Sequence, residues 1–153
     1  SKGALRILNA APALPQGAAL FPLTDILILN QTELATYAKL DREPVRLEDV
    51  SLAARKLMSR PDQTIIVTLG ATGVAAVRRD EAFLVEGRKV KAIDTVGAGD
   101  CFCGALAAAL GANMDLREAV EMANAAAALS VQKSGAAPSM PNRREVEAFL
   151  NGD

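Results

Sequence analysis

Histidine and tryptophan are both absent from this chain of 153 residues. Because Ser-His-Asp and Cys-His hydrolases take their general base from histidine, these enzymes are excluded unless another chain supplies that residue. A general base here must come from a carboxylate, lysine, tyrosine or cysteine. The two cysteines, Cys101 and Cys103, have no third cysteine or histidine with which to complete a zinc site. Free thiols are typical of a reducing compartment, so we expect a cytoplasmic protein.

Aromatic residues are scarce, with 4 phenylalanines and 1 tyrosine, although 50% of the residues are hydrophobic. This composition predicts a single domain, residues 1–153, with an aliphatic, alanine-rich core. The 17 basic and 18 acidic side chains give a net charge of −1 without a basic stripe, which argues against nucleic acid as the main partner. No apolar run has the length of a membrane span and no leader pattern opens the chain, so neither a membrane nor secretion is expected.

Apolar runs alternate with helical patterns through the first hundred residues, which predicts an α/β fold with a parallel sheet and helices on both faces. The predicted strands are residues 6–10, 25–29, 64–68, 74–77, 82–85 and 90–93. The predicted helices are residues 30–40, 47–60, 100–110 and 115–133, followed by a last helix that begins at Asn142. Asn30 with Glu33, Asp115 with Glu118, and Asn142 with Glu145 have the spacing of capping boxes.

The segment Asp94-Thr95-Val96-Gly97-Ala98-Gly99-Asp100 precedes a helix of small residues. Glycines at 97 and 99 allow a tight turn, and the helix start adds unpaired N–H groups, so an anion could bind here. An acidic residue at this position is explained if Asp100 takes a proton from a hydroxyl that attacks a phosphate. The alternative is that Asp100 only caps the helix.

Three further loops carry weaker signals. Asn30-Gln31-Thr32-Glu33 follows a buried strand, and so does the glycine-bracketed loop Thr68–Gly73. Because ligands of α/β proteins collect at the carboxyl ends of strands, both are candidates for a binding site. Ser134–Ser139 offers bent backbone carbonyls. Taken alone, these loops are explained as a capping box, a hairpin entry and a helix stop.

Other nucleotide-binding classes fit less well. The sequence contains no G-x-x-x-x-G-K-[ST], which argues against a P-loop protein. The glycines at 97, 99 and 104 do not have the spacing G-x-G-x-x-G, and they lie late in the chain. A dinucleotide-dependent oxidoreductase is therefore disfavoured.

Together and in this order, these segments resemble the ribokinase-like family of carbohydrate kinases. The matching segments are Ile7–Ala13, Asn30–Glu33, Thr68–Gly73, Asp94–Asp100 and Gly135–Ser139. The resemblance implies a three-layer α-β-α fold with a mainly parallel sheet. It also implies transfer of the γ-phosphoryl of ATP to a sugar hydroxymethyl group. It is strongest to members that phosphorylate ribose, although another sugar or a nucleoside stays open as the acceptor.

The resemblance also implies residue roles. Asp100 would be the catalytic base in contact with the sugar hydroxyl, and the N–H groups of Gly97, Ala98, Gly99 and Asp100 would form the anion hole. Glu33 would hold Mg²⁺ through water. The implied ATP-binding residues are Asn30, Thr68, Gly70, Gly73, Gly99 and Asn124. The implied K⁺ ligands are Asp94, Val96, Ser130, Lys133, Gly135 and Ser139.

The matched segments form roughly the second half of the proteins in that family. We therefore expect the chain to be a fragment that lacks an N-terminal half with a β lid and most sugar contacts. Such a fragment would bind ATP weakly and phosphorylate no sugar alone, whereas the intact protein could form a homodimer. A non-catalytic nucleotide-binding or scaffolding role with a partner is the alternative.

Overall fold

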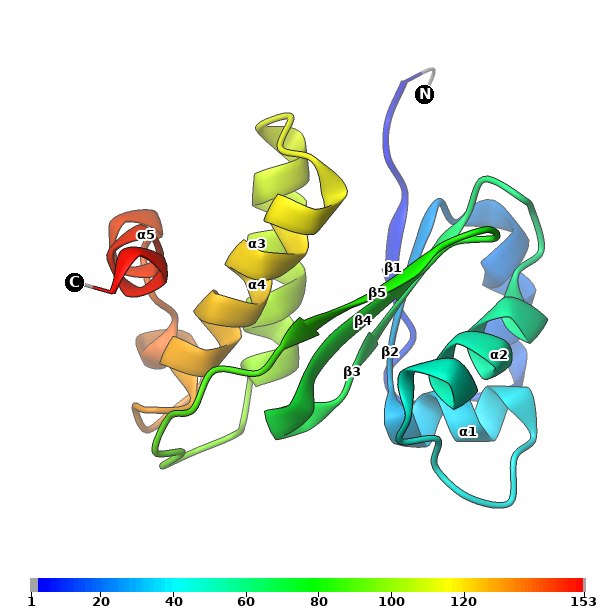
Figure 1. Cartoon of the computed structure of the whole chain (residues 1–153), viewed down its shortest axis with the longest axis horizontal. Coiled ribbons are helices and arrows are strands. Elements are labelled where there is room, and N and C mark those ends of the chain that lie inside the picture. The colour runs from blue at the N-terminus through cyan, green and yellow to red at the C-terminus, as the bar shows by residue number, and fades with distance from the viewer. Residues whose placement is uncertain (1–2, 153) are drawn as a thin grey trace. The chain divides into compact units, whose positions relative to one another are not determined.

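A computed structural model describes residues 3–152, which divide between Leu84 and Val85 into two compact units (Figure 1). The first unit holds β1 (Ile7–Asn9), η1 (Pro15–Leu23), β2 (Ile26–Asn30), α1 (Gln31–Ala38), α2 (Leu47–Leu57), β3 (Thr64–Thr68), η2 (Gly70–Thr72) and β4 (Gly73–Val77). Strand β5 (Ala82–Glu86) crosses the boundary. The second unit holds α3 (Ala98–Gly111), α4 (Leu116–Ser130), η3 (Ala137–Ser139) and α5 (Arg143–Asn151). That the chain is one domain stays a prediction.

The sheet contains five strands in the order β1-β2-β3-β4-β5. β2 is parallel to both β1 and β3, whereas β4 is antiparallel to β3. Only the short η2 lies between β3 and β4, and a parallel connection needs a crossover of about a dozen residues or more. The prediction of a mainly parallel α/β sheet is confirmed, and so are the two strands predicted around residues 78–81.

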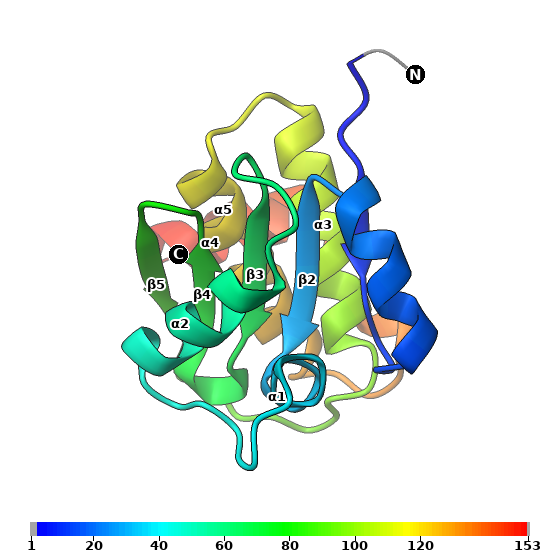
Figure 2. The same cartoon turned by 90° about the vertical axis from the view of Figure 1, so that its right-hand side faces the viewer.

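The core of the first unit is aliphatic. Ile26–Leu29 of β2 and Ile65–Val67 of β3 are buried without alternation, as expected for central strands covered on both faces. Helices α1 and α2 pack on one face of the sheet (Figure 2). The spacing of Val50, Ala53 and Ala54 places these buried side chains on one stripe of α2.

An ion-pair network closes the amino end of this sheet. The Asp25 carboxylate accepts hydrogen bonds from the backbone N–H and the guanidinium of Arg6, at 2.8–3.0 Å, and from Nη2 of Arg60 at 2.7 Å. Arg60 also contacts Asp62. Hydrogen bonds from Arg6, and then from Arg60, hold the pKa of Asp25 far below its ordinary value. One carboxylate thus connects the segments before β1, β2 and β3.

The second unit is helical in its described part, and α3 packs along α4. Cys101, Ala125, Ala126 and Val146 form its buried cluster, so α3, α4 and α5 share one core. Asn142 and Glu145 form the predicted capping box of α5. No helix within residues 3–152 is both long and apolar enough to span a bilayer.

Several predicted boundaries are wrong. Residues 90–93 form no strand. Helix α2 ends at Leu57 rather than Arg60, and α4 ends at Ser130 rather than Lys133. Helix α3 begins two residues before Asp100, so Gly97 is its N-cap and Asp100 its third residue. Asp115 caps α4 by accepting the N–H of Glu118, but the return bond of a capping box is not formed.

Candidate active site

The carboxyl ends of β2 and β3 bring three predicted site residues together. Asn30 and Thr68 are direct neighbours in the parallel register, and Glu33 lies in the first turn of α1. The Asn30 side chain accepts the N–H of Glu33 at 2.8 Å, while Oε2 of Glu33 accepts the N–H of Asn30 at 2.8 Å. This reciprocal cap fixes both side chains at the strand end, where ligands of α/β proteins gather.

Glu33 is a buried carboxylate with one oxygen available. Its exposed fraction is 7%, and no residue among 3–152 donates a hydrogen bond to Oε1. No group of three or more Cys, Asp or Glu side chains that could hold a metal occurs in that range. A single carboxylate fits Mg²⁺ only if waters and phosphate oxygens supply the other ligands, which is how Mg²⁺ usually binds beside nucleotides.

Two glycines shape the loop between β3 and β4. Gly70 has φ of 56° and Gly73 has φ of 118°, values that residues with side chains rarely adopt. The N–H of Leu69 donates to the carbonyl of Gly73 at 2.8 Å, which closes the loop. Thr68, Gly70 and Gly73 therefore lie together next to Asn30 and Glu33, all within the first unit.

The glycine turn before α3 lies in the second unit. Gly97 has φ of 81°, and a Cβ on it would meet the Cβ of Ala136 at 3.0 Å. Both the backbone conformation and the close approach of the 134–139 loop therefore require glycine here.

The first turn of α3 presents unpaired donors. No carbonyl among residues 3–152 accepts a hydrogen bond from the N–H of Gly97, Gly99 or Asp100, whereas the N–H of Ala98 donates to Thr95 at 3.3 Å. The carboxylate of Asp100 is exposed at the same turn. Free N–H groups, a positive helix end and an exposed carboxylate thus coincide, which is the arrangement needed to hold an anion beside a base.

Asp94 ties the glycine turn to the loop after α4. Oδ1 accepts the N–H of Val96 and Oδ2 accepts the N–H of Gly135, both at 2.9 Å. The bond from Gly135, followed by that from Val96, holds the pKa of Asp94 below its ordinary value. The carbonyl of Val131 accepts the N–H groups of Ile93 and Asp94 at 2.7 and 3.1 Å.

The other residues of the predicted K⁺ site are near this junction in sequence, and their oxygens differ in availability. The Ser130 carbonyl accepts the N–H of Lys133 at 3.2 Å, and the Ser139 hydroxyl donates to the carbonyl of Ala136 at 2.7 Å. Within residues 3–152, no donor engages the carbonyls of Val96, Lys133 or Gly135. Three free carbonyls and a carboxylate are a donor set that suits a large, weakly hydrated monovalent cation.

Asn124 has a structural partner. It is a buried residue of α4, with 8% exposed, and its Nδ2 donates to the carbonyl of Glu86 at 2.9 Å. Sequence reasoning did not identify Val131, which positions Asp94 through its backbone carbonyl. A carbonyl leaves no trace in the side-chain pattern, so no sequence signal could have found it.

The structure thus groups the predicted residues into two sets, one in each unit. Asn30, Glu33, Thr68, Gly70 and Gly73 belong to the first unit. The residues from Asp94 to Asp100, together with Asn124, Ser130, Lys133, Gly135 and Ser139, belong to the second.

Comparison with known proteins assigns the family. Residues 1–143 match the pfkB family of carbohydrate kinases. The chain belongs to this family. Among curated relatives, it is 35% identical over 147 residues to the ribokinase of Schizosaccharomyces pombe, covering 95% of this chain and 46% of that protein. It is 37% identical over 144 residues to the ribokinase of Haemophilus influenzae, with coverages of 94% and 46%.

Solved structures of similar proteins support the same family assignment. Ribokinase from Thermotoga maritima has a TM-score of 0.87 at 37% identity, covering 97% of this chain and 50% of that one. Arabidopsis thaliana ribokinase, solved with ribose and ATP, has a TM-score of 0.85 at 32% identity, with coverages of 97% and 48%. The predicted ribokinase-like fold is confirmed. The chain spans about half the length of the curated relatives it matches.

Proposed function

We propose that this chain forms the nucleotide-binding and catalytic part of a kinase that transfers the γ-phosphoryl of ATP to the hydroxymethyl group of a sugar, D-ribose above all. The first turn of α3 carries the proposal, because it places free N–H groups beside the exposed carboxylate of Asp100. Two of the similar proteins support the substrates: one ribokinase is solved with ribose and ATP, and another with ADP.

The proposed chemistry follows from this turn. As the sugar oxygen forms its bond to the γ-phosphorus, the Asp100 carboxylate accepts the hydroxyl proton. The bond from the γ-phosphorus to its bridging oxygen breaks, and ADP leaves. The N–H groups of Gly97, Gly99 and Asp100 stabilise negative charge on the transferring group, and removing one such donor typically costs about 10²–10³ in turnover. Ala98 contributes less, since its N–H already contacts Thr95.

The proposed ATP-binding residues are Asn30, Thr68, Gly70, Gly73, Gly99 and Asn124. Glu33 is proposed to hold Mg²⁺ through water, using the oxygen that its cap leaves free. When bound, Mg²⁺ supplies positive charge against the phosphates. A homologous protein of this fold is solved with ATP and Mg²⁺, which supports the pairing. Asn124 would reach a nucleotide through its Oδ1 or through the second hydrogen of Nδ2, because the other hydrogen is donated to the carbonyl of Glu86.

A monovalent cation is the third proposed cofactor. The carboxylate of Asp94, the carbonyls of Val96, Lys133 and Gly135, and more weakly Ser130 and Ser139, would hold K⁺. Its charge would stabilise the turn that contains Gly97, because Asp94 bonds to Val96 immediately before that turn.

The proposed activity requires a longer protein. Besides this chain, that protein must contain a counterpart of the half of the relatives that this chain does not match. That half would supply most contacts to the sugar. We further propose a cytoplasmic enzyme that could dimerise when intact.

The test is the Asp100→Asn variant of the full-length protein. We expect turnover with ribose to fall by about 10²–10⁴, the usual contribution of a general base, while ATP affinity measured by calorimetry stays nearly unchanged. Asp41→Asn is the matched control, because Asp41 is exposed in the first unit.

Deoxyribose and fructose belong in the same assay, since a deoxyribokinase and a fructokinase are among the similar proteins. Near-normal turnover of Asp100→Asn would show that Asp100 is not the catalytic base and only complements the dipole of α3 as an acidic residue of its first turn. ATP binding without turnover of any sugar by the unaltered protein would favour the non-catalytic alternative.

A further inference from the structure

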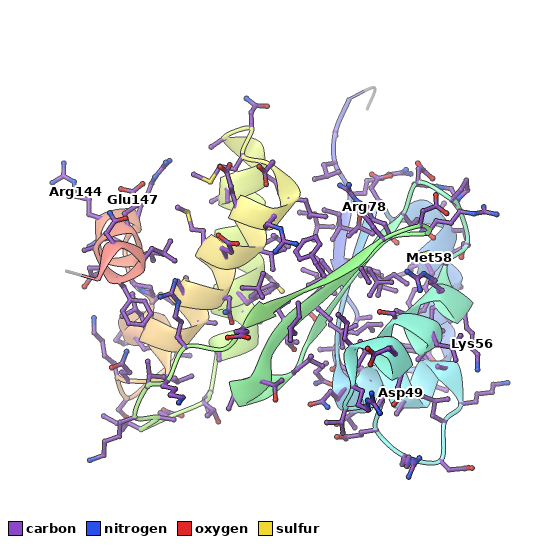
Figure 3. All side chains as sticks on the ribbon, viewed as in Figure 1. Asp49, Lys56, Met58, Arg78, Arg144 and Glu147 are labelled. Carbon is purple, nitrogen blue, oxygen red and sulfur yellow. The ribbon has the colours of Figure 1, made fainter. Side chains whose placement is uncertain are left out.

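A pocket of about 240 Å³ lies in the first unit, at the amino end of the sheet. Its lining residues are Arg55, Met58, Ser59, Arg60, Pro61 and Arg79. Residues 59–61 precede β3, and Arg79 follows β4, whose last residue, Val77, pairs with Ile65. Figure 3 labels Met58, which directly follows α2, and Arg78, which directly follows β4. The pocket therefore lies at the opposite end of β3 from Thr68.

The arginines of this pocket differ in how they are bonded. Each of the three guanidinium nitrogens of Arg60 donates a hydrogen bond, to Asp25, to Asp62 or to the carbonyl of Pro22. Arg55 uses only Nε, which donates to the carbonyl of Arg78 at 3.2 Å. Within residues 3–152, no group accepts a hydrogen bond from the terminal nitrogens of Arg55 or from any side-chain nitrogen of Arg79.

No carboxylate among residues 3–152 forms an ion pair with either of these two side chains. Asp25 and Asp62 pair with Arg60, and Glu81 pairs with Arg78 at 2.9 Å. Asp80, next to Arg79, is exposed and forms no ion pair among the described residues. Arg55 lies in the last turn of α2, where it also complements the helix dipole. That explanation does not apply to Arg79, which comes from the turn between β4 and β5 and lines the same pocket.

We infer that this pocket binds a phosphate group, either inorganic phosphate or a small phosphate ester, between Arg55 and Arg79. A guanidinium offers paired N–H groups that match two phosphate oxygens, and an anion offsets the repulsion between two cations that line the same pocket. The N–H groups of Ser59 and Arg60 both donate to Oε1 of Gln63, at 2.7 and 3.0 Å, so side chains must hold the anion. The Ser59 hydroxyl is a further donor at the wall.

This site is separate from the candidate ATP residues of the same unit. Asn30 and Thr68 end β2 and β3, whereas the pocket adjoins the start of β3, and five residues of strand span roughly 16 Å. Phosphate should therefore bind while ATP is present. The inference does not depend on the proposed kinase activity.

The test measures inorganic phosphate binding by calorimetry and by amide chemical shifts, with saturating ATP present to occupy other anion sites. We expect Arg79→Gln and Arg55→Gln each to weaken binding by about tenfold to a hundredfold, the usual effect of losing a charged hydrogen bond. Arg79→Lys should recover part of the phosphate affinity. It keeps the positive charge, but it lacks the paired N–H groups of the guanidinium. Arg42→Gln, an exposed arginine of the same unit outside the pocket, should bind as the unaltered protein does.

Glycerol phosphate distinguishes a phosphate ester from inorganic phosphate as the ligand. If glycerol phosphate binds more tightly than inorganic phosphate, the pocket takes an ester; if it binds more weakly, the pocket takes free phosphate. The inference fails if phosphate has no greater effect than chloride at equal ionic strength. It also fails if Arg79→Gln and Arg42→Gln bind phosphate equally well.

Discussion

At the scale of single residues, Asp94 connects two segments of the second unit that are distant in sequence. Its two oxygens accept the N–H groups of Val96 and Gly135, so one side chain fixes the turn before α3 against the loop after α4. The carboxylate of Asp100, in contrast, accepts no hydrogen bond from any residue among 3–152 and lies exposed at the third position of α3. A fixed carboxylate suits a positioning role, and a free one suits proton transfer.

The proposed K⁺ site is tested at this scale. We expect the full-length protein to transfer phosphate to ribose faster in KCl than in NaCl at equal ionic strength, if the proposed activity is correct. K⁺ should also raise the melting temperature more than Na⁺, because only the folded turn offers the carbonyl ligands. Asp94→Asn should abolish both differences. The control is Asp115→Asn, which alters a carboxylate at the cap of α4 instead. Equal rates and equal melting temperatures in the two salts would rule out a specific K⁺ site.

At the scale of elements, the start of α3 depends on one glycine. Gly97→Ala places a side chain at φ of 81° and brings its Cβ to 3.0 Å from that of Ala136. We expect a loss of about 1–3 kcal/mol in the free energy of unfolding, measured by urea titration, and lower turnover of the full-length protein.

Gly104→Ala is the control for that variant within the same helix. Gly104 lies in the middle of α3, and a Cβ added there would meet no atom within 4 Å, so alanine should stabilise the helix by about 0.5–1 kcal/mol. If Gly97→Ala were as stable as the unaltered protein, the turn would not require glycine.

The elements also show what the sequence could predict. The buried runs of β2 and β3 and the capping box at Asn30 were recoverable, because burial on both faces and reciprocal caps leave local patterns. Val90–Ile93 has the composition of a strand, but no neighbouring strand pairs with it within residues 3–152; instead, the Ile93 N–H donates to Val131. Partners distant in sequence, including Arg55 and Arg79 of the pocket at the amino end of the sheet, leave no such local pattern.

At the scale of the whole molecule, low pH should weaken the fold. The pKa of Asp25 is lowered by Arg6 and Arg60, and that of Asp94 by two backbone N–H groups. A carboxylate with a lowered native pKa stabilises the fold above its unfolded pKa, about 3.9, and this contribution disappears as pH falls through the native value. Both units therefore lose stability in acid.

Asp25→Asn tests this expectation in chemical unfolding from pH 7 to pH 2. The variant should be less stable than the unaltered protein at pH 7, and the difference should shrink below about pH 4, where Asp25 itself begins to protonate in the unfolded chain. Asp41→Asn should change stability by no more than about 0.5 kcal/mol at any pH. A difference for Asp25→Asn that stays constant over the whole range would refute the assignment.

The network around Asp25 also constrains how this sequence can change over time. Two arginines from distant positions share a single carboxylate, so losing Asp25 leaves Arg6 without this ion pair and Arg60 with Asp62 alone, whereas losing Arg6 still leaves Asp25 paired with Arg60. The order of substitutions at these positions is therefore constrained. Arg6 can be replaced first, whereas replacement of Asp25 requires earlier changes at the arginines.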